Sequence, residues 1–155
     1  MTQKNYIPVS IVYADDDPED RMLAKDALEE SRILNPVNFV EDGEELMEYL
    51  QNKGKYQDRK KYPTPALILL DLNMPKKNGI DVLKEMKKDD KLKKIPVVVL
   101  TTSSDREDIQ QTYELGVSSF ITKPVTFDGL VEIMKTLGKY WFEVVALPET
   151  KQLHS

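Results

Sequence analysis

The stretch Ala66-Leu67-Ile68-Leu69-Leu70-Asp71 decides the fold, because five apolar residues run directly into a carboxylate. A short apolar run without alternation is typical of a β-strand that is buried on both faces. An unpaired carboxylate is costly in an apolar core, so the strand is expected to end at Asp71. In open α/β sheets, binding and catalytic groups gather at this edge. From this stretch alone, Asp71 is equally well interpreted as a functional carboxylate or as a loop cap.

Strand-like and helix-like segments alternate five times along the chain. The other expected strands cover residues 9–14, 37–40, 95–100 and 117–122, and a helix with apolar residues at helical spacing follows each strand. The first helix is expected to start at Pro18 and to use Met22, Leu23, Ala27 and Leu28 as its apolar positions. This order predicts one α/β domain in which helices cover both faces of a parallel sheet. Residues 52–65 form a polar loop whose basic side chains are interpreted as solvated.

Composition excludes several classes of function. At 155 residues the chain fits one domain, and a net charge of -5 argues against nucleic acid or an anionic membrane as partner. The chain has no cysteine, and its single histidine is His154, so histidine-dependent catalysis and zinc sites are not expected. The first residues lack the apolar core of a signal peptide, and no apolar run approaches the ~20 residues of a membrane span. The expected location is the cytoplasm.

Polar residues follow four of the expected strands, each directly after its apolar run: Asp15 and Asp16, Asp71, Thr101, and Lys123. Because the carboxyl ends of parallel strands meet at one edge of a sheet, these side chains are expected to lie together. Each of them has an ordinary structural explanation when it is taken alone. Asp17, for example, is expected only to cap the first helix, and Glu19 and Asp20 suit the positive end of its dipole. Their joint position predicts a functional site.

The residue types of this site point to phosphoryl chemistry. Three carboxylates repel one another, and a hard divalent cation with oxygen ligands relieves that repulsion; Mg²⁺ fits best. Asp15 and Asp16 would hold the ion, and Asp71 could act as a carboxylate nucleophile that forms an aspartyl phosphate. Lys123 would stabilise the phosphoryl charge, and Thr101 could donate a hydrogen bond to it only after transfer, as a switch would.

With these motifs, residues 9–137 resemble the receiver domains of two-component response regulators. The resemblance implies a flavodoxin-like (βα)5 fold with strand order 2-1-3-4-5. It also implies that a histidine kinase or a histidine phosphotransfer protein phosphorylates Asp71. Mg²⁺ would then be bound by Asp16, Asp71 and the main-chain carbonyl of Asn73, and by Asp15 through water. The domain would be a phosphoacceptor that promotes its own phosphotransfer and dephosphorylation, and not an enzyme with a separate substrate.

The resemblance also concerns the switch region. Thr102 joins Thr101 there, and Phe120 stands where many members carry an aromatic switch residue, without the hydroxyl of the tyrosine variant. Family members have a cis Lys-Pro bond, so a cis bond is expected before Pro124. The loop 52–65, residues 100–103 and the pair at 140–141 resemble the small stand-alone regulators that are paired with bacterial phytochromes.

The end of the chain suggests an interface. We expect a receiver domain over residues 1–147, with a core over 9–139, a helical extension over 140–147 and a flexible tail over 148–155. A stand-alone receiver would signal through the face formed by its fourth helix, fifth strand and fifth helix. The extension carries an apolar stripe that the domain itself does not need, which predicts a homodimer through Tyr140, Trp141, Val144 and Val145.

Three alternatives come from other classes. An aspartyl phosphatase would need a second acid two residues after the nucleophile, where this chain has Asn73. A flavodoxin would need a phosphate-binding loop after the first strand, where this chain has Asp15, Asp16 and Asp17. A protein-interaction module that works without phosphorylation stays open, although the complete set of strand-end residues argues against it.

Overall fold

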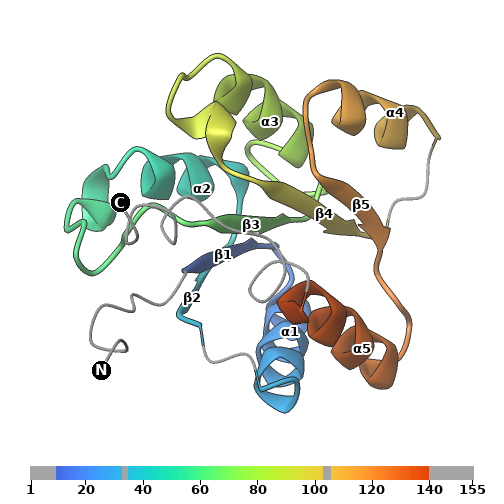
Figure 1. Ribbon diagram of the computed structural model, residues 1–155. Coiled ribbons are helices and arrows are strands. Elements are labelled where there is room, and N and C mark those ends of the chain that lie inside the picture. The colour runs from blue at the N-terminus through green and yellow to red at the C-terminus, as the bar shows by residue number, and fades with distance from the viewer. Residues whose placement is uncertain (1–9, 33–34, 103–105, 140–155) are drawn as a thin grey trace.

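The protein is built around one five-stranded parallel sheet (Figure 1). The computed structural model describes residues 10–32, 35–102 and 106–139. The strand order is β2-β1-β3-β4-β5, with β3 in the centre. The strands are β1 (Ile11–Ala14), β2 (Val37–Val40), β3 (Leu67–Leu70), β4 (Val97–Thr101) and β5 (Ser119–Thr122). The predicted flavodoxin-like fold is therefore confirmed, with its strand order.

Helices cover both faces of the sheet: α1 and α5 lie on one side, and α2, α3 and α4 on the other (Figure 1). They are α1 (Pro18–Glu30), α2 (Gly43–Leu50), α3 (Gly79–Lys87), α4 (Arg106–Glu114) and α5 (Phe127–Gly138), with short 3-10 turns η2 (Gly54–Tyr56) and η3 (Leu92–Lys94). Four N-terminal caps accept hydrogen bonds from main-chain N–H groups of the first turns: Asp17, Asp42, Asn78 and Thr126. Within the described ranges, no helix is long and apolar enough to cross a membrane.

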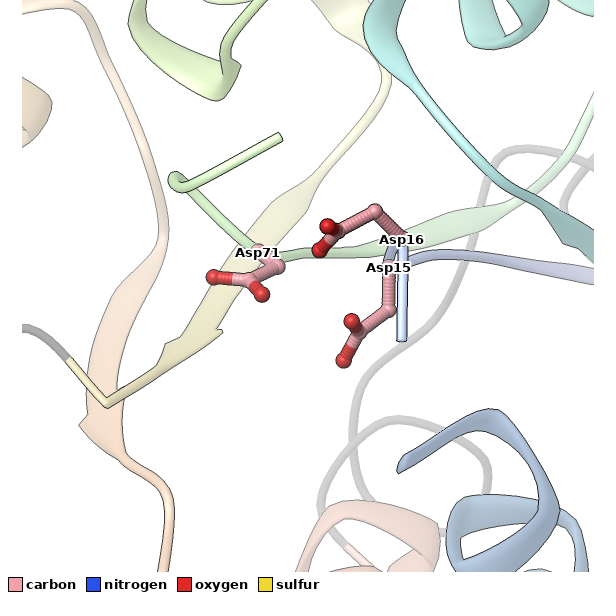
Figure 2. A group of neighbouring side chains, drawn as sticks. All are labelled: Asp15, Asp16 and Asp71. Atoms are coloured by element: carbon pink, nitrogen blue, oxygen red, sulfur yellow. The ribbon is translucent and has the colours of Figure 1, made fainter. Parts of the chain in front are cut away.

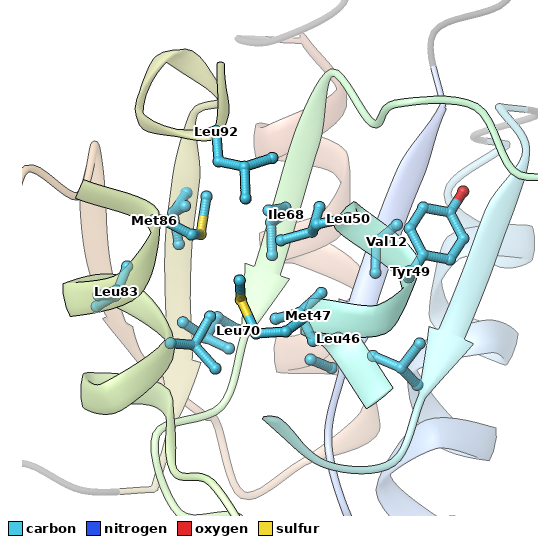
Figure 3. Packing of buried hydrophobic residues seen from close by; sticks show 14 of the residues in the cluster. Val12, Leu46, Met47, Tyr49, Leu50, Ile68, Leu70, Leu83, Met86 and Leu92 are labelled. Atoms are coloured by element: carbon cyan, nitrogen blue, oxygen red, sulfur yellow. The ribbon is translucent and has the colours of Figure 1, made fainter. Parts of the chain in front are cut away.

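Strand β3 is buried on both faces, as its apolar run predicts. Ile68 and Leu70 belong to the core beneath α2 and α3, which Figure 3 shows. Leu67 and Leu69 belong to the core beneath α1 and α5. The central strand is thus fixed from both sides, and it carries Asp71 at its carboxyl end on a rigid support.

Gly79 lets α3 begin directly against the segment that follows β3. Its N–H donates to the carbonyl oxygen of Leu72 over 2.9 Å. A Cβ at position 79 would lie 2.8 Å from the carbonyl oxygen of Asp71 and 2.8 Å from the Cα of Leu72. Only glycine permits this approach, so the start of α3 braces the main chain at Asp71.

Met22 and Leu23, two of the four expected apolar positions of α1, do not belong to its buried stripe. Their side chains are 66% and 43% exposed, whereas Ala24, Ala27 and Leu28 are buried. The buried residues have the spacing i, i+3, i+4, and α1 packs with this stripe beside α5. By helical spacing, Leu23 lies at the margin of this stripe and Met22 lies on the opposite side of the helix.

The loop after α2 is anchored by three tyrosines, Tyr49, Tyr56 and Tyr62, which we call the tyrosine cluster. Their ring centroids lie 4.8 to 5.8 Å apart. Asn52 donates its side-chain amide to the carbonyl oxygens of Tyr56 (2.9 Å) and Tyr62 (3.1 Å). Basic side chains of the loop are exposed, as expected, but Lys55 lies over the ring of Tyr56. The loop is thus more ordered by side chains than its polar composition predicts.

Candidate functional site

The strand ends bring the three predicted carboxylates together. Figure 2 shows Asp15 and Asp16 at the end of β1 and Asp71 at the end of β3. One carboxylate oxygen of each lies within 4.8 Å of the others. Asp15 is fully buried and Asp71 is nearly so, whereas Asp16 is exposed. The register of β1 and β3 explains the grouping, because Ala14 and Leu70 are paired directly before these residues.

Lys123 reaches the carboxylates from the end of β5. Its Nζ donates to Oδ2 of Asp15 and lies 3.4 Å from Oδ2 of Asp71. The main-chain N–H of Lys123 donates to the carbonyl oxygen of Thr101 over 2.8 Å, so the pairing of β4 and β5 fixes the main chain from which the side chain extends. The side chain is only 10% exposed. The predicted neighbourhood of Lys123 with Asp15 and Asp71 is therefore present.

Both oxygens of Asp71 have donors. The Thr101 hydroxyl donates to Oδ1 over 2.6 Å, and the N–H of Asn73 donates to the same oxygen over 3.2 Å. Lys123 faces Oδ2. Donors on a carboxylate hold its plane in one orientation, which is what a nucleophile or a metal ligand needs. Asp71 is thus oriented from β3, β4 and β5 at once.

Burial and pairing act against each other at this site. Burial raises the pKa of Asp15, although the hydrogen bond from Lys123 opposes the shift. For Lys123, burial favours the neutral amine, but the hydrogen bond with Asp15 and the nearby Asp71 outweigh it and raise the pKa of the ammonium. Lys123 is therefore charged at neutral pH and able to neutralise added negative charge.

Two residues at the site are not part of the strand-end pattern. Asp20, in the first turn of α1, places Oδ2 3.0 Å from Nζ of Lys123. Arg21 donates to the carbonyl oxygen of Asp15 over 2.8 Å and to Oε1 of Glu41 over 3.2 Å. Asp20 was expected only to favour the helix dipole. The sequence could have indicated Asp20 as a site residue, because α1 is expected to start at the edge of the sheet where the strand-end residues lie.

The remaining predicted residues lie as follows. Phe120 is in β5, partly buried, and its N–H donates to the hydroxyl of Tyr113 over 3.1 Å. Thr102 is exposed at the end of β4.

The expected cis bond between Lys123 and Pro124 is wrong for this structure: the bond is trans. Trans is the lower-energy isomer by about 0.5–1 kcal/mol, and Lys123 reaches its carboxylates with it. The predicted interface residues lie outside the described ranges: Tyr140, Trp141, Val144 and Val145.

The donor set fits a hard divalent cation. Its ligands would be carboxylate and carbonyl oxygens, which Mg²⁺ and Mn²⁺ prefer. The chain has no cysteine, and its single histidine, His154, lies outside the described ranges. Asp16 is exposed and can present its oxygens to an ion beside Asp71.

Known proteins are similar to this chain in sequence and in fold. Residues 11–135 match the family model of the response regulator receiver domain. Response regulator Rcp1 of Synechocystis sp. (strain ATCC 27184 / PCC 6803 / Kazusa) is 38% identical over 148 residues, which cover 96% of this chain and 99% of Rcp1. The phosphorylated cyanobacterial phytochrome response regulator RcpA has a similar structure, with a TM-score of 0.84 and 41% identity over 92% of this chain and 99% of that one.

The Mn²⁺-bound form of Rcp1 is similar as well, with a TM-score of 0.81 and 40% identity over 91% of this chain and 99% of that one. The match to the family model spans all five strands and the polar residues that end them. The resemblance inferred from Asp71 and its neighbours is thereby confirmed, and this chain belongs to the response regulator receiver domains of two-component signalling.

Proposed function

We propose that the protein accepts a phosphoryl group on Asp71 from a sensor histidine kinase or a histidine phosphotransfer protein. The observation that carries this proposal is the setting of Asp71 itself. Its carboxylate is held between the hydroxyl of Thr101 and the ammonium of Lys123, beside Asp15 and Asp16. A carboxylate so oriented is a nucleophile with charge stabilisation already in place.

The transfer step exchanges one bond for another. A carboxylate oxygen of Asp71 attacks phosphorus while the bond from phosphorus to the donor imidazole nitrogen breaks, and the electron pair of that bond returns to the nitrogen. Lys123 neutralises part of the charge on the phosphoryl oxygens. The Thr101 hydroxyl, which now donates to Asp71, turns to a phosphoryl oxygen. The protein acts as a phosphoacceptor, and hydrolysis of its own aspartyl phosphate would end the signal.

Mg²⁺ is the proposed cofactor, and when bound it would neutralise phosphoryl oxygens. Both oxygens of Asp15 already accept hydrogen bonds, Oδ1 from the N–H of Asp17 (3.0 Å) and Oδ2 from Lys123. The oxygens of Asp71 have donors as well, so the proposed ligand set follows the family resemblance: Asp16, Asp71 and the carbonyl of Asn73 would bind directly, and Asp15 would act through water. The Mn²⁺-bound form of the related Rcp1 supports a divalent ion.

The surface around the site supports delivery by another protein. Met22 and Leu23 on α1 and Val125 and Phe127 after β5 are exposed apolar side chains, and all but Met22 line a pocket with Lys123. Because they lie beside Lys123, these residues would bind the protein that carries the donor histidine. Because the related RcpA is a phytochrome response regulator, a bacterial phytochrome kinase is the proposed donor.

We further propose that phosphorylation is read at the face formed by α4, β5 and α5. Thr101 ends β4 and Lys123 follows β5, so a change in the hydrogen-bond partners of these two residues would shift the neighbouring elements of this face. The hydrogen bond from Phe120 to Tyr113 links β5 to α4. A receiver over residues 1–147, dimeric through its extension at 140–147, remains the proposed assembly. Sedimentation that shows a monomer at high concentration, with and without phosphorylation, would exclude the dimer.

The phosphoacceptor proposal is tested with acetyl phosphate, a small phosphoryl donor. With Mg²⁺, the wild type should gain one phosphoryl group by intact mass, and Asp71→Asn should gain none. Asp81→Asn, an exposed aspartate on α3, is the matched control and should behave as wild type. The proposal fails if the wild type gains no mass with Mg²⁺, or if Asp71→Asn gains as much. A wild type that also fails to bind beryllofluoride would favour an interaction module without phosphorylation.

A further inference from the structure

The ammonium of Lys123 contacts three carboxylates, one more than its predicted partners Asp15 and Asp71. The third is Asp20, whose Oδ2 lies 3.0 Å from Nζ. The distance from Nζ to Oδ2 of Asp71 is 3.4 Å, which is longer. An ammonium has three N–H donors, and here each faces one carboxylate. Lys123 is therefore drawn toward β1 and α1 and away from Asp71.

Phosphorylation changes what Lys123 has to do. A strong charge-assisted bond from the ammonium to a phosphoryl oxygen needs a distance of about 2.7–2.9 Å. Asp15 and Asp20 already hold the ammonium, so a phosphoryl group on Asp71 competes with these two carboxylates for it. When the ammonium turns toward the phosphoryl group, at least one of these two contacts weakens.

The two contacts on that side differ in the cost of losing them. Asp15 is fully buried, so releasing Lys123 would remove the direct cationic partner of a carboxylate that bulk water cannot reach. The side chain of Asp20 is 35% exposed, so water can hydrate it when Lys123 leaves. The contact to Asp20 is therefore the one that is given up.

We propose that Asp20 is a positioning residue that competes with the phosphoryl group for Lys123 and so lowers the stability of the phosphorylated state. This inference rests on the proposed phosphoacceptor function. It assigns Asp20 a regulatory effect: its carboxylate sets how much phosphoryl donor is needed to activate the receiver and how long the activated state lasts.

The test measures beryllofluoride binding in the presence of Mg²⁺ by NMR, with the main-chain amides of Thr101 and Lys123 as reporters. Asp20→Asn keeps the shape of the side chain and removes its charge. It should bind beryllofluoride about fivefold more tightly than wild type, the size expected for a partly exposed charge pair. The aspartyl phosphate formed from acetyl phosphate should last longer by a similar factor.

Two further variants separate competition from other effects. Glu19→Gln removes the same charge from the same turn of α1, at an exposed residue, and should bind beryllofluoride as wild type does. Asp20→Glu keeps a carboxylate and should return the affinity toward the wild-type value. Damage to the structure would weaken binding, so a gain confined to Asp20→Asn reports on Lys123 alone.

The inference is overturned if Asp20→Asn binds beryllofluoride no more tightly than wild type, or if Glu19→Gln shows an equal gain. In both cases a wild type that binds leaves the phosphoacceptor function intact. A wild type that does not bind beryllofluoride with Mg²⁺ overturns both proposals together.

Discussion

The Asp71 site and the tyrosine cluster both withdraw a carboxylate from water, but they treat it differently. Asp15 shares Lys123 with two other carboxylates, and burial raises its pKa. Glu45, beside the cluster, accepts from the hydroxyl of Tyr56 and from the N–H of Glu41 over 2.7 Å, and Lys55 lies 3.3 Å away. Burial alone would raise the pKa of Glu45, but these bonds outweigh it and lower that pKa.

The difference separates a site that can change partners from one that cannot. A donor shared by three acceptors can be reassigned when a new anion or a cation arrives. The Tyr56 hydroxyl and the Glu41 N–H are dedicated to one carboxylate, and they only stabilise the two segments that supply them. Substitutions at the Asp71 site should therefore respond to Mg²⁺, and substitutions at the tyrosine cluster should not.

Replacing Lys123 with methionine should have the largest effect. It leaves Asp15 buried without its cation, and breaking such a pair costs about 3 kcal/mol of unfolding free energy. Mg²⁺ should recover part of this loss, because it supplies positive charge and binds only the folded protein. Urea unfolding of wild type and Lys123→Met, with and without Mg²⁺, measures both values.

The pH dependence of this variant has a definite sign. Asp15 has a raised pKa when folded, so folded protein binds more protons than unfolded protein, and stability falls as pH rises through that range. Lys123 opposes the shift, so its removal raises the pKa of Asp15 further. Lys123→Met should therefore lose more unfolding free energy at neutral pH than near pH ~5. If the stability lost in Lys123→Met did not depend on pH or on Mg²⁺, Lys123 would not be a donor that the three carboxylates share. Lys135→Met, which removes a lysine from an exposed ion pair, is the control.

Gly79→Ala should cost about 2 kcal/mol, since the new Cβ meets main-chain atoms that cannot turn aside. The start of α3 would have to move from Asp71 and Leu72, so beryllofluoride binding should weaken as well. Urea unfolding and the NMR titration of the same sample give both quantities. Normal stability together with normal binding would show that α3 does not brace Asp71.

The sequence predicts the sheet and the four strand-end groups because both follow from local pattern. An apolar run sets the strand, and parallel strands bring the next polar residue to a common edge. Asp20 could not be assigned in this way, because it lies in the first turn of α1 and not at the end of a strand. Its contact with Lys123 depends on how α1 packs beside α5, which is a tertiary property.

Two other differences have the same origin. Met22 and Leu23 were expected from apolar spacing, but the sheet covers the stripe of Ala24, Ala27 and Leu28, and spacing alone does not say which stripe of a helix faces the sheet. The loop after α2 is polar by composition, yet Tyr56 is buried, because a tyrosine packs its ring and keeps its hydroxyl bonded. Hydropathy alone does not resolve such a residue.

Tyr56→Phe tests the dedicated bond of the tyrosine cluster. Loss of a hydrogen bond to a charged group costs about 1.5 kcal/mol, and Mg²⁺ should not change this value. Because the pKa of Glu45 is lowered on folding, its stabilisation is present above its ordinary value of 4.5 and is lost as pH falls through the folded pKa. The difference between wild type and variant should therefore shrink in acid. If Mg²⁺ restored the stability of Tyr56→Phe, the tyrosine cluster would not differ from the Asp71 site in its response to the ion.

Tyr113→Phe should have the smallest effect, about 0.5 kcal/mol or less, because Tyr113 is half-exposed and water can replace its hydroxyl at the edge of the sheet. Its consequence should be local: the amide of Phe120 should exchange with solvent about threefold faster, since it loses its protein acceptor. Hydrogen exchange followed by NMR measures this, and unchanged exchange would show that the bond does not hold β5 to α4. Tyr113 thus differs from both the Asp71 site and the tyrosine cluster. Water can replace its hydrogen bond, so the bond stabilises the fold little, and yet it can still couple β5 to α4.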